Sequence, residues 1–95
     1  MPKIRLTKQF KKDYAKAAKR GKSLVKIKKV LLLLEEGEAL PKKYKDHSLT
    51  GNYVNSRDCH IEPDWLLIYN INGDTITLER TGSLSISGFY ATNSY

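Results

Sequence analysis

The run W-L-L-I-Y at residues 65–69 constrains the fold more than any other segment of the chain. Successive side chains of a β-strand point to opposite faces, so five consecutive apolar residues make both faces apolar, which is typical of a strand covered on both sides. E-P-D at 62–64 precedes the run, and N-G-D at 72–74, a strong hairpin signal, follows it. We therefore expect a central strand at 65–71 with both faces buried.

The remaining segments show two different hydrophobic periods. Residues 52–61 and 75–80 alternate with a period of two, as strands do, and K-I-R-L at 3–6 reads as a further short strand. Apolar residues recur at helical spacing over 7–20 and 24–34, which predicts two helices joined by about two residues. The order β-α-α-β-β-β predicts an α+β domain in which a two-helix hairpin packs on a twisted antiparallel sheet.

The charge balance indicates the kind of partner. The 95 residues suffice for one domain, and 17 Lys and Arg against 10 Asp and Glu give a formal charge of +7. Such a chain is expected to bind a polyanion: nucleic acid first, then an acidic protein or an anionic membrane surface.

Other totals concern the cellular compartment. The single cysteine, Cys59, excludes an intramolecular disulfide, which fits a reducing cytoplasm. The longest apolar run, V-L-L-L-L at 30–34, is far too short to span a membrane, and the first residues lack the apolar core of a signal peptide. We expect a small, soluble, cytoplasmic protein with no membrane part.

Polar residues that can carry chemistry gather around the segment R-D-C-H-I-E-P-D at 57–64. In a strand, Asp58 and His60 share one face, and the following turn brings Asp64 beside them. His47 lies in the loop that leads into this strand and can approach the same rim. A histidine titrates near neutral pH, and an adjacent carboxylate fixes its tautomer, so this set is a candidate for proton transfer.

Spacing alone leaves other readings open. The same residues can form an exposed polar face, or supply nitrogen and oxygen ligands to a metal, although no HExxH or CxxC motif is present. Cys59 points to the opposite face with Arg57 and Ile61, which favours a core thiol over a nucleophile. Lys42, Lys43 and Lys45 either hold phosphates or form a solvated loop.

Three motifs in order narrow these readings: Y-K-D-H-S-L-T-G at 44–51, R-D-C-H-I-E-P-D-W-L-L-I-Y at 57–69 and E-R-T-G-S at 79–83. In sequence and spacing they resemble the YafQ-like branch of the RelE superfamily of bacterial toxins, from the first helix to about Ser83. The resemblance implies a RelE-like fold of the microbial-ribonuclease type. It also implies a toxin of a type II toxin-antitoxin system.

The resemblance further implies an activity and its partners. Such toxins are endoribonucleases that inhibit translation by cutting mRNA in the A site of the ribosome, with no metal or other cofactor. A ribose 2′-OH attacks the neighbouring phosphate, which requires a base, an acid and cations near the phosphate oxygens. The implied partners are the 30S ribosomal subunit, mRNA, and a DinJ- or RelB-like antitoxin of the ribbon-helix-helix class.

Residue by residue, the resemblance assigns His47, His60 and Asp64 to the catalytic set, Asp58 to its supporting carboxylate and Arg80 to the phosphate charge. Which histidine is base and which acid stays open. The residues expected to contact RNA or the ribosome are Lys42, Lys43, Lys45, Arg57 and Phe89.

The chain departs from the family pattern after Ser83. Leu84 stands where the family has a histidine, and Phe89 comes one residue later than the family phenylalanine. A lost acid or base costs about 10²–10⁴-fold in rate. Either the toxin has been disarmed, by substitution or by a frameshift, or it is a natural variant. We expect a single toxin domain over 1–95 with an atypical tail at 85–95, and the alternative function is an inactive module that binds RNA, the ribosome or the antitoxin.

Overall fold

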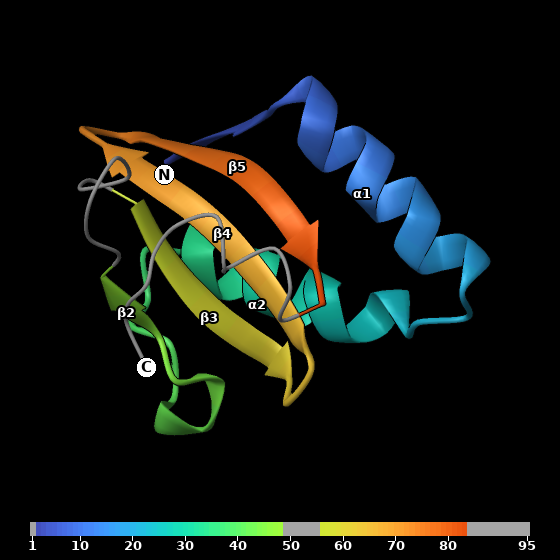
Figure 1. The fold of residues 1–95 in the computed structure, drawn as a ribbon. Coiled ribbons are helices and arrows are strands. Elements are labelled where there is room, and N and C mark those ends of the chain that lie inside the picture. Colours follow the sequence, from blue (N-terminus) through green and yellow to red (C-terminus); the bar gives the residue numbers. More distant parts are fainter. Residues whose placement is uncertain (1, 49–55, 84–95) are drawn as a thin grey trace.

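A computed structural model describes residues 2–48 and 56–83, which form two helices and one five-stranded sheet (Figure 1). The strands lie in the order β1-β5-β4-β3-β2. The elements are β1 (Lys3–Leu6), α1 (Lys8–Lys19), α2 (Leu24–Glu35), the 3-10 turn η1 (Lys42–Tyr44), β2 (His47–Ser48), β3 (Ser56–Glu62), β4 (Trp65–Asn72) and β5 (Thr75–Gly82).

Strand β4 is the central strand, as expected from its sequence. It pairs antiparallel with β3 on one side and with β5 on the other. All residues of the W-L-L-I-Y run are buried. The predicted α+β class with helices packed on a sheet is confirmed.

The sheet differs from the expectation at both edges. Strand β1 pairs parallel with β5, with Ile4 opposite Ile76, so the sheet is mixed rather than wholly antiparallel. At the other edge, His47 and Ser48 form the short strand β2 instead of a loop and pair antiparallel with β3. Strands of four and two residues are too short for a periodic pattern to reveal their partners or direction. The first residues of the expected strand at 52–61 lie outside the described residues, which resume at Ser56.

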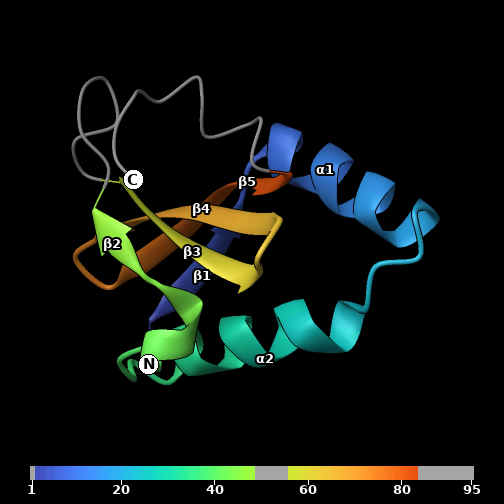
Figure 2. The same ribbon diagram turned by 60° about the horizontal axis from the view of Figure 1, so that its bottom comes forward.

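Helix α1 directly follows β1, and α1 and α2 lie against different parts of the sheet. Thr7 caps α1, because its Oγ1 accepts the Phe10 N–H at 2.9 Å. Gly21 adopts a left-handed conformation, with φ of 78°, in the link of residues 20–23, which is longer than expected. Figure 2 shows α2 running below one face of the sheet and α1 beyond the β5 side.

The main core lies between α2 and the face of the sheet that it covers. Its buried side chains come from both helices, from η1 and from three strands: Phe10, Ala17, Ile27, Val30, Leu34, Tyr44, Cys59, Ile61, Trp65, Leu67, Tyr69, Ile76 and Leu78. Cys59 is fully buried in this core, as the alternation of the strand predicts. Neither helix of the described residues is long and apolar enough to cross a membrane.

Candidate active site

His47 and Asp58 form an ion pair across β2 and β3. The two residues are register partners, and His47 Nε2 lies 3.0 Å from Asp58 Oδ1. His47 Nδ1 lies 2.8 Å from the carbonyl oxygen of Lys45. Because a carbonyl oxygen only accepts hydrogen bonds, we assign a proton to Nδ1, and Nε2 faces the Asp58 carboxylate. The imidazole is therefore fixed from both of its nitrogens.

Burial distinguishes the two partners. The Asp58 side chain is 0% exposed, whereas the His47 side chain is 29% exposed. A buried carboxylate needs a paired charge or a hydrogen-bond donor, and His47 supplies it. Asp58 is thus an internal group that orients His47, and the histidine forms the outer side of the pair.

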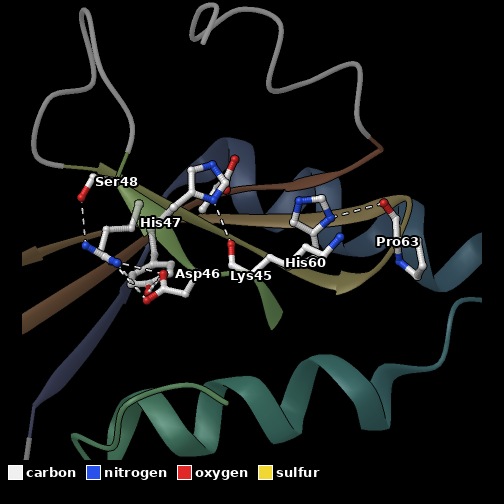
Figure 3. A network of polar contacts seen from close by, with 9 residues as sticks. Lys45, Asp46, His47, Ser48, His60 and Pro63 are labelled. Atoms are coloured by element: carbon white, nitrogen blue, oxygen red, sulfur yellow. Dashed lines mark hydrogen bonds and ion pairs between the residues drawn. The ribbon is translucent and has the colours of Figure 1, made fainter. Parts of the chain in front are cut away.

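His60 lies two residues farther along β3, on the same face as Asp58. Its Nδ1 is 3.3 Å from the carbonyl oxygen of Pro63 in the following turn. In the neutral ring this contact places the proton on Nδ1 and the lone pair on Nε2. Figure 3 shows the rings of His47 and His60 on the same side of the sheet, opposite α2. The structure therefore brings the two histidines to one face, as the sequence suggested.

Arg80 is fixed by a carboxylate of α1. Its Nε donates to Asp13 Oδ2 at 3.1 Å and its Nη2 donates to Asp13 Oδ1 at 3.3 Å, which is a bidentate pair. Asp13 is only 6% exposed and also accepts the backbone N–H of Thr81 at 3.2 Å. Asp13 therefore satisfies a donor on β5 and sets the direction of the Arg80 guanidinium.

Arg80 and His47 stand at a distance from each other on the sheet. Ile68 of β4 is the register partner of both Asp58 and Arg80, so the row His47, Asp58, Ile68, Arg80 crosses four strands. Three strand spacings correspond to about 14 Å between the Cα atoms of His47 and Arg80. Direct contact between these two side chains is therefore not the basis of the site, and a substrate has to span the gap.

Two hollows lie beside these residues. The first, here called the α1 hollow, has a volume of about 330 Å³, and Arg80, Asp64 and α1 contribute to its walls. The second, the α2 hollow, has a volume of about 380 Å³ and places His60 near Lys43, Lys45, Lys26 and Lys29. Two of the lysines expected to bind RNA thus share a hollow with a catalytic candidate.

The sequence pattern of one protein family, described as bacterial toxin of type II toxin-antitoxin system, YafQ, matches residues 2–86. The chain belongs to the YafQ toxin family. The match covers both histidines, Asp58, Asp64 and Arg80, and it ends within the segment that departs from the expected motif.

Individual YafQ proteins agree with this assignment. The mRNA interferase toxin YafQ of Escherichia coli K12 is 43% identical over 76 residues, which are 79% of this chain and 83% of the relative. The crystal structure of YafQ from E. coli BL21(DE3) matches with a TM-score of 0.85 and 39% identity, over 90% of this chain and 97% of that one. The toxin in the E. coli DinJ-YafQ complex gives the same values. The RelE-like fold expected from the motifs is confirmed.

Arg57 differs from the other residues that the YafQ resemblance assigned to RNA. Its Nη2 pairs with Asp46 Oδ2 at 3.1 Å, and its Nη1 donates to Ser48 Oγ at 2.9 Å. Tyr69 donates to Asp46 Oδ1 at 2.6 Å, from the neighbouring strand. The Asp46 hydrogen bond raises the pKa of Arg57 above its ordinary value. The guanidinium is thus committed to a network that holds the segment carrying His47.

Asp46 and Asp13 are the residues of the site that sequence reasoning missed. Asp46 stands next to His47 within the motif Y-K-D-H, so its position in a motif was a signal. Asp13 lies in a lysine-rich helix, and nothing in the local pattern connects it with Arg80, which is 67 residues away.

Two residues of the expected site, Leu84 and Phe89, lie outside the described residues. Within residues 2–48 and 56–83, no three His, Cys, Asp or Glu side chains gather closely enough to hold a metal ion. Burial raises the pKa of the Cys59 thiol well above its usual range, which is the state of a core residue rather than of a nucleophile.

Proposed function

We propose that this YafQ-family toxin is an mRNA interferase that cuts mRNA in the ribosomal A site by metal-free attack of a ribose 2′-OH on the adjacent phosphate. The relative with 43% identity carries the name mRNA interferase toxin. The observation that carries the proposal is the shared face of His60 and the His47–Asp58 pair, with a pair distance of 3.0 Å. Two histidines in fixed orientations are what a proton-in, proton-out reaction requires.

Each residue has a chemical part in this proposal. In its neutral form the His60 ring can accept the 2′-OH proton at Nε2, and His47, in its protonated form, can donate a proton to the departing 5′-oxygen. Arg80, fixed by Asp13, stabilises charge on the phosphate oxygens, and Asp64 lies at the rim of the same hollow. Lys42, Lys43, Lys45 and Phe89 contact the RNA in this proposal, and Leu84 stands at the sequence position of the family histidine.

The same proposal includes partners and a compartment. The formal charge of +7 suits the 30S ribosomal subunit and mRNA, and the E. coli DinJ-YafQ complex supports a ribbon-helix-helix antitoxin as the neutralising partner. All of these act in the cytoplasm.

The test is cleavage of mRNA on programmed ribosomes in EDTA, with the cut sites mapped by primer extension. We expect cutting within the A-site codon, and we expect His60→Ala to lower its rate about 10²–10⁴-fold. Thr77→Ala, an exchange of a polar side chain elsewhere on the sheet, is the matched control and should cut like the parent. Equal rates for His60→Ala and the parent would remove His60 from the reaction.

A second candidate function is a non-catalytic module that binds the antitoxin or the ribosome, and Leu84 favours it because the family has a histidine there. A Leu84→His variant distinguishes the two functions in the same assay. Cutting by this variant alone means that the chain is a disarmed toxin. Cutting by both means that His47 and His60 suffice. Cutting by neither, with ribosome or antitoxin binding retained, supports the non-catalytic module.

A further inference from the structure

The α1 hollow carries three cationic side chains that the proposed reaction does not use: Lys16 of α1, and Arg20 and Lys22 of the following link. Its volume is about 330 Å³, and Arg80 of β5 is a fourth cation in its lining. The two carboxylates in the lining are Asp13 and Asp64. Cations therefore outnumber carboxylates by two in a concave part of the surface, which favours a bound anion.

The ion pairs of the hollow show which cations remain for a ligand. Asp13 is engaged by Arg80 and by the Thr81 N–H. Lys22 pairs with Glu62 at 3.3 Å. No ion pair joins Lys16 or Arg20 to an acidic side chain among residues 2–48 and 56–83. Lys16 and Arg20 are thus the cations of the lining that no ion pair among the described residues engages.

The spacing of Lys16 and Arg20 along the helix brings both side chains to the α1 hollow. Asp13, Lys16 and Ala17 lie on one face of α1, and Arg20, the residue that caps its carboxyl end, continues that face three residues after Ala17; all four line the hollow. The hollow lies at the carboxyl end of α1, where the helix dipole disfavours an anion. Attraction of an anion therefore depends on the side chains, which makes it sensitive to their substitution.

The opposite wall is rigid. The buried indole N–H of Trp65 donates to Thr81 Oγ1 at 2.9 Å, and this hydroxyl donates to the Leu66 carbonyl at 2.7 Å. Lys22 lies over the Trp65 ring, with Nζ 5.8 Å from its centroid. The hollow is thus a preformed site between two elements fixed by buried hydrogen bonds.

We propose that the α1 hollow binds an RNA phosphate next to the one that is cleaved, with Lys16 and Arg20 as its ligands. The inference rests on the proposed function, because Asp64 and Arg80, which belong to the expected catalytic set, line the same hollow. An RNA chain with one phosphate at Arg80 continues directly into the α1 hollow. The volume is at the small end of ligand pockets and fits one nucleotide unit rather than a helix of a protein partner. The phosphate belongs either to the mRNA or to ribosomal RNA, which offer the same chemistry.

The first experiment measures binding without cleavage. The parent chain is titrated with inorganic phosphate and with a short 2′-O-methyl oligoribonucleotide, which lacks the nucleophile, while amide NMR shifts are followed. We expect the largest shifts at Arg20, Lys22 and Gly82, and we expect Lys16→Ala/Arg20→Ala to weaken oligonucleotide binding about tenfold. Lys8→Ala/Lys11→Ala is the control, since it removes two charges from positions of α1 that do not line the hollow. Equal affinities for the two variants would overturn the proposal, whether or not the chain cuts mRNA.

The second experiment identifies the source of the phosphate. If it belongs to ribosomal RNA, Lys16→Ala/Arg20→Ala weakens binding to empty ribosomes. If it belongs to mRNA, binding to empty ribosomes matches the control variant, while KM on programmed ribosomes rises about tenfold and kcat is retained. An mRNA that ends directly after the cleaved codon should abolish this difference in KM when the phosphate lies downstream. A variant that matches the control on both kinds of ribosome contradicts the site.

Discussion

Asp46 holds the segment that presents His47. Its carboxylate accepts hydrogen bonds from Arg57 of β3 and Tyr69 of β4, at distances between 2.6 and 3.3 Å. Neighbouring residues of an extended segment point to opposite sides, so fixing Asp46 toward one side directs His47 to the other. Asp58 of the neighbouring strand β3 then pairs with the His47 imidazole. The orientation of His47 thus depends on Asp46, Arg57 and Tyr69 as well as on Asp58.

Substitution of Asp46 tests this arrangement. Asp46→Asn leaves the Arg57 guanidinium without its charge partner, and we expect a loss of about 1–2 kcal/mol in the free energy of unfolding, because the network is partly exposed. The His47 ring should also lose its fixed environment. Urea unfolding and the NMR signals of the His47 ring measure the two effects. An unchanged His47 signal in Asp46→Asn would show that Asp46 does not position the ring.

The pKa values of Tyr69 and Cys59 predict how stability depends on alkaline pH. Burial, together with the hydrogen bond to Asp46, raises the pKa of Tyr69, and burial raises that of Cys59. In the unfolded chain, the pKa of Tyr69 is about 10 and that of Cys59 is about 8.5. Because the pKa values are raised in the folded state, the contribution of these groups to the free energy of unfolding is fully present below the pKa values of the unfolded chain. It is lost as pH rises above them.

We therefore expect the free energy of unfolding to fall above about pH 8.5, and more steeply above about pH 10, by up to about 1.4 kcal/mol per pH unit for each group. Urea unfolding between these pH values measures the slope. Tyr69→Phe removes one titrating group, so its curve should be flatter above pH 10 whatever its absolute stability. Parallel curves for the parent and Tyr69→Phe would contradict the burial of this hydroxyl.

At the scale of elements, Thr7 joins three parts of the fold. Its Oγ1 accepts the Phe10 N–H at 2.9 Å and donates to the Glu79 carbonyl at 2.9 Å, while its backbone N–H donates to Leu78 at 3.2 Å. One residue therefore ends β1, starts α1 and binds both to β5. The direction of α1, and with it the position of Asp13, is set at this point.

Thr7→Ala removes both hydroxyl hydrogen bonds, and we expect it to lower the free energy of unfolding by about 1–2 kcal/mol. Thr7→Ser keeps the hydroxyl and should retain most of the stability. Thermal and urea unfolding of the two variants compare them directly. Equal loss in both would assign the effect to the Thr7 methyl group rather than to the cap.

The elements that the sequence predicted well are those with a long apolar pattern. The helices run for 12 residues with apolar side chains at helical spacing, and the 8 residues of β4 contain a continuous apolar run. β1 and β2 run for 4 and 2 residues, and their pairing depends on distant partners. The contacts of Asp46 and Asp13 join residues far apart in sequence, which no local pattern reports. Motif order located the histidines, Asp58 and Arg80, whereas the contacts of Asp46 and Asp13 became visible only in three dimensions.

At the scale of the molecule, the β3–β4 turn separates two basic hollows. Asp64 and Trp65 line the α1 hollow, whereas His60 and Pro63 line the α2 hollow. The positive charge of the chain thus faces both sides of a turn that carries expected catalytic residues. Under the proposed function, an RNA that crosses this turn would meet cations on both sides of it.

Cys59 reports on the integrity of the whole core. It is the only cysteine, it is fully buried, and its pKa is raised by burial. We expect iodoacetamide to label the folded protein only through global opening, so the rate of labelling should rise with urea in parallel with the unfolded fraction. Mass spectrometry measures the labelled fraction. Rapid labelling in the absence of denaturant would show local opening of β3.

The central strand contributes no side chain to the expected catalytic set. Strand β2 supplies His47, β3 supplies Asp58 and His60, the β3–β4 turn supplies Asp64, and β5 supplies Arg80. Strand β4 supplies buried apolar residues to both faces of the sheet. The topology and the chemistry are therefore encoded by separate parts of the sequence. Under relaxed selection, the rim can diverge while β4 preserves the fold, and a lineage that has lost cleavage still presents the shape that its antitoxin evolved to bind. Such a descendant would compete for antitoxin with active toxins of the same cell.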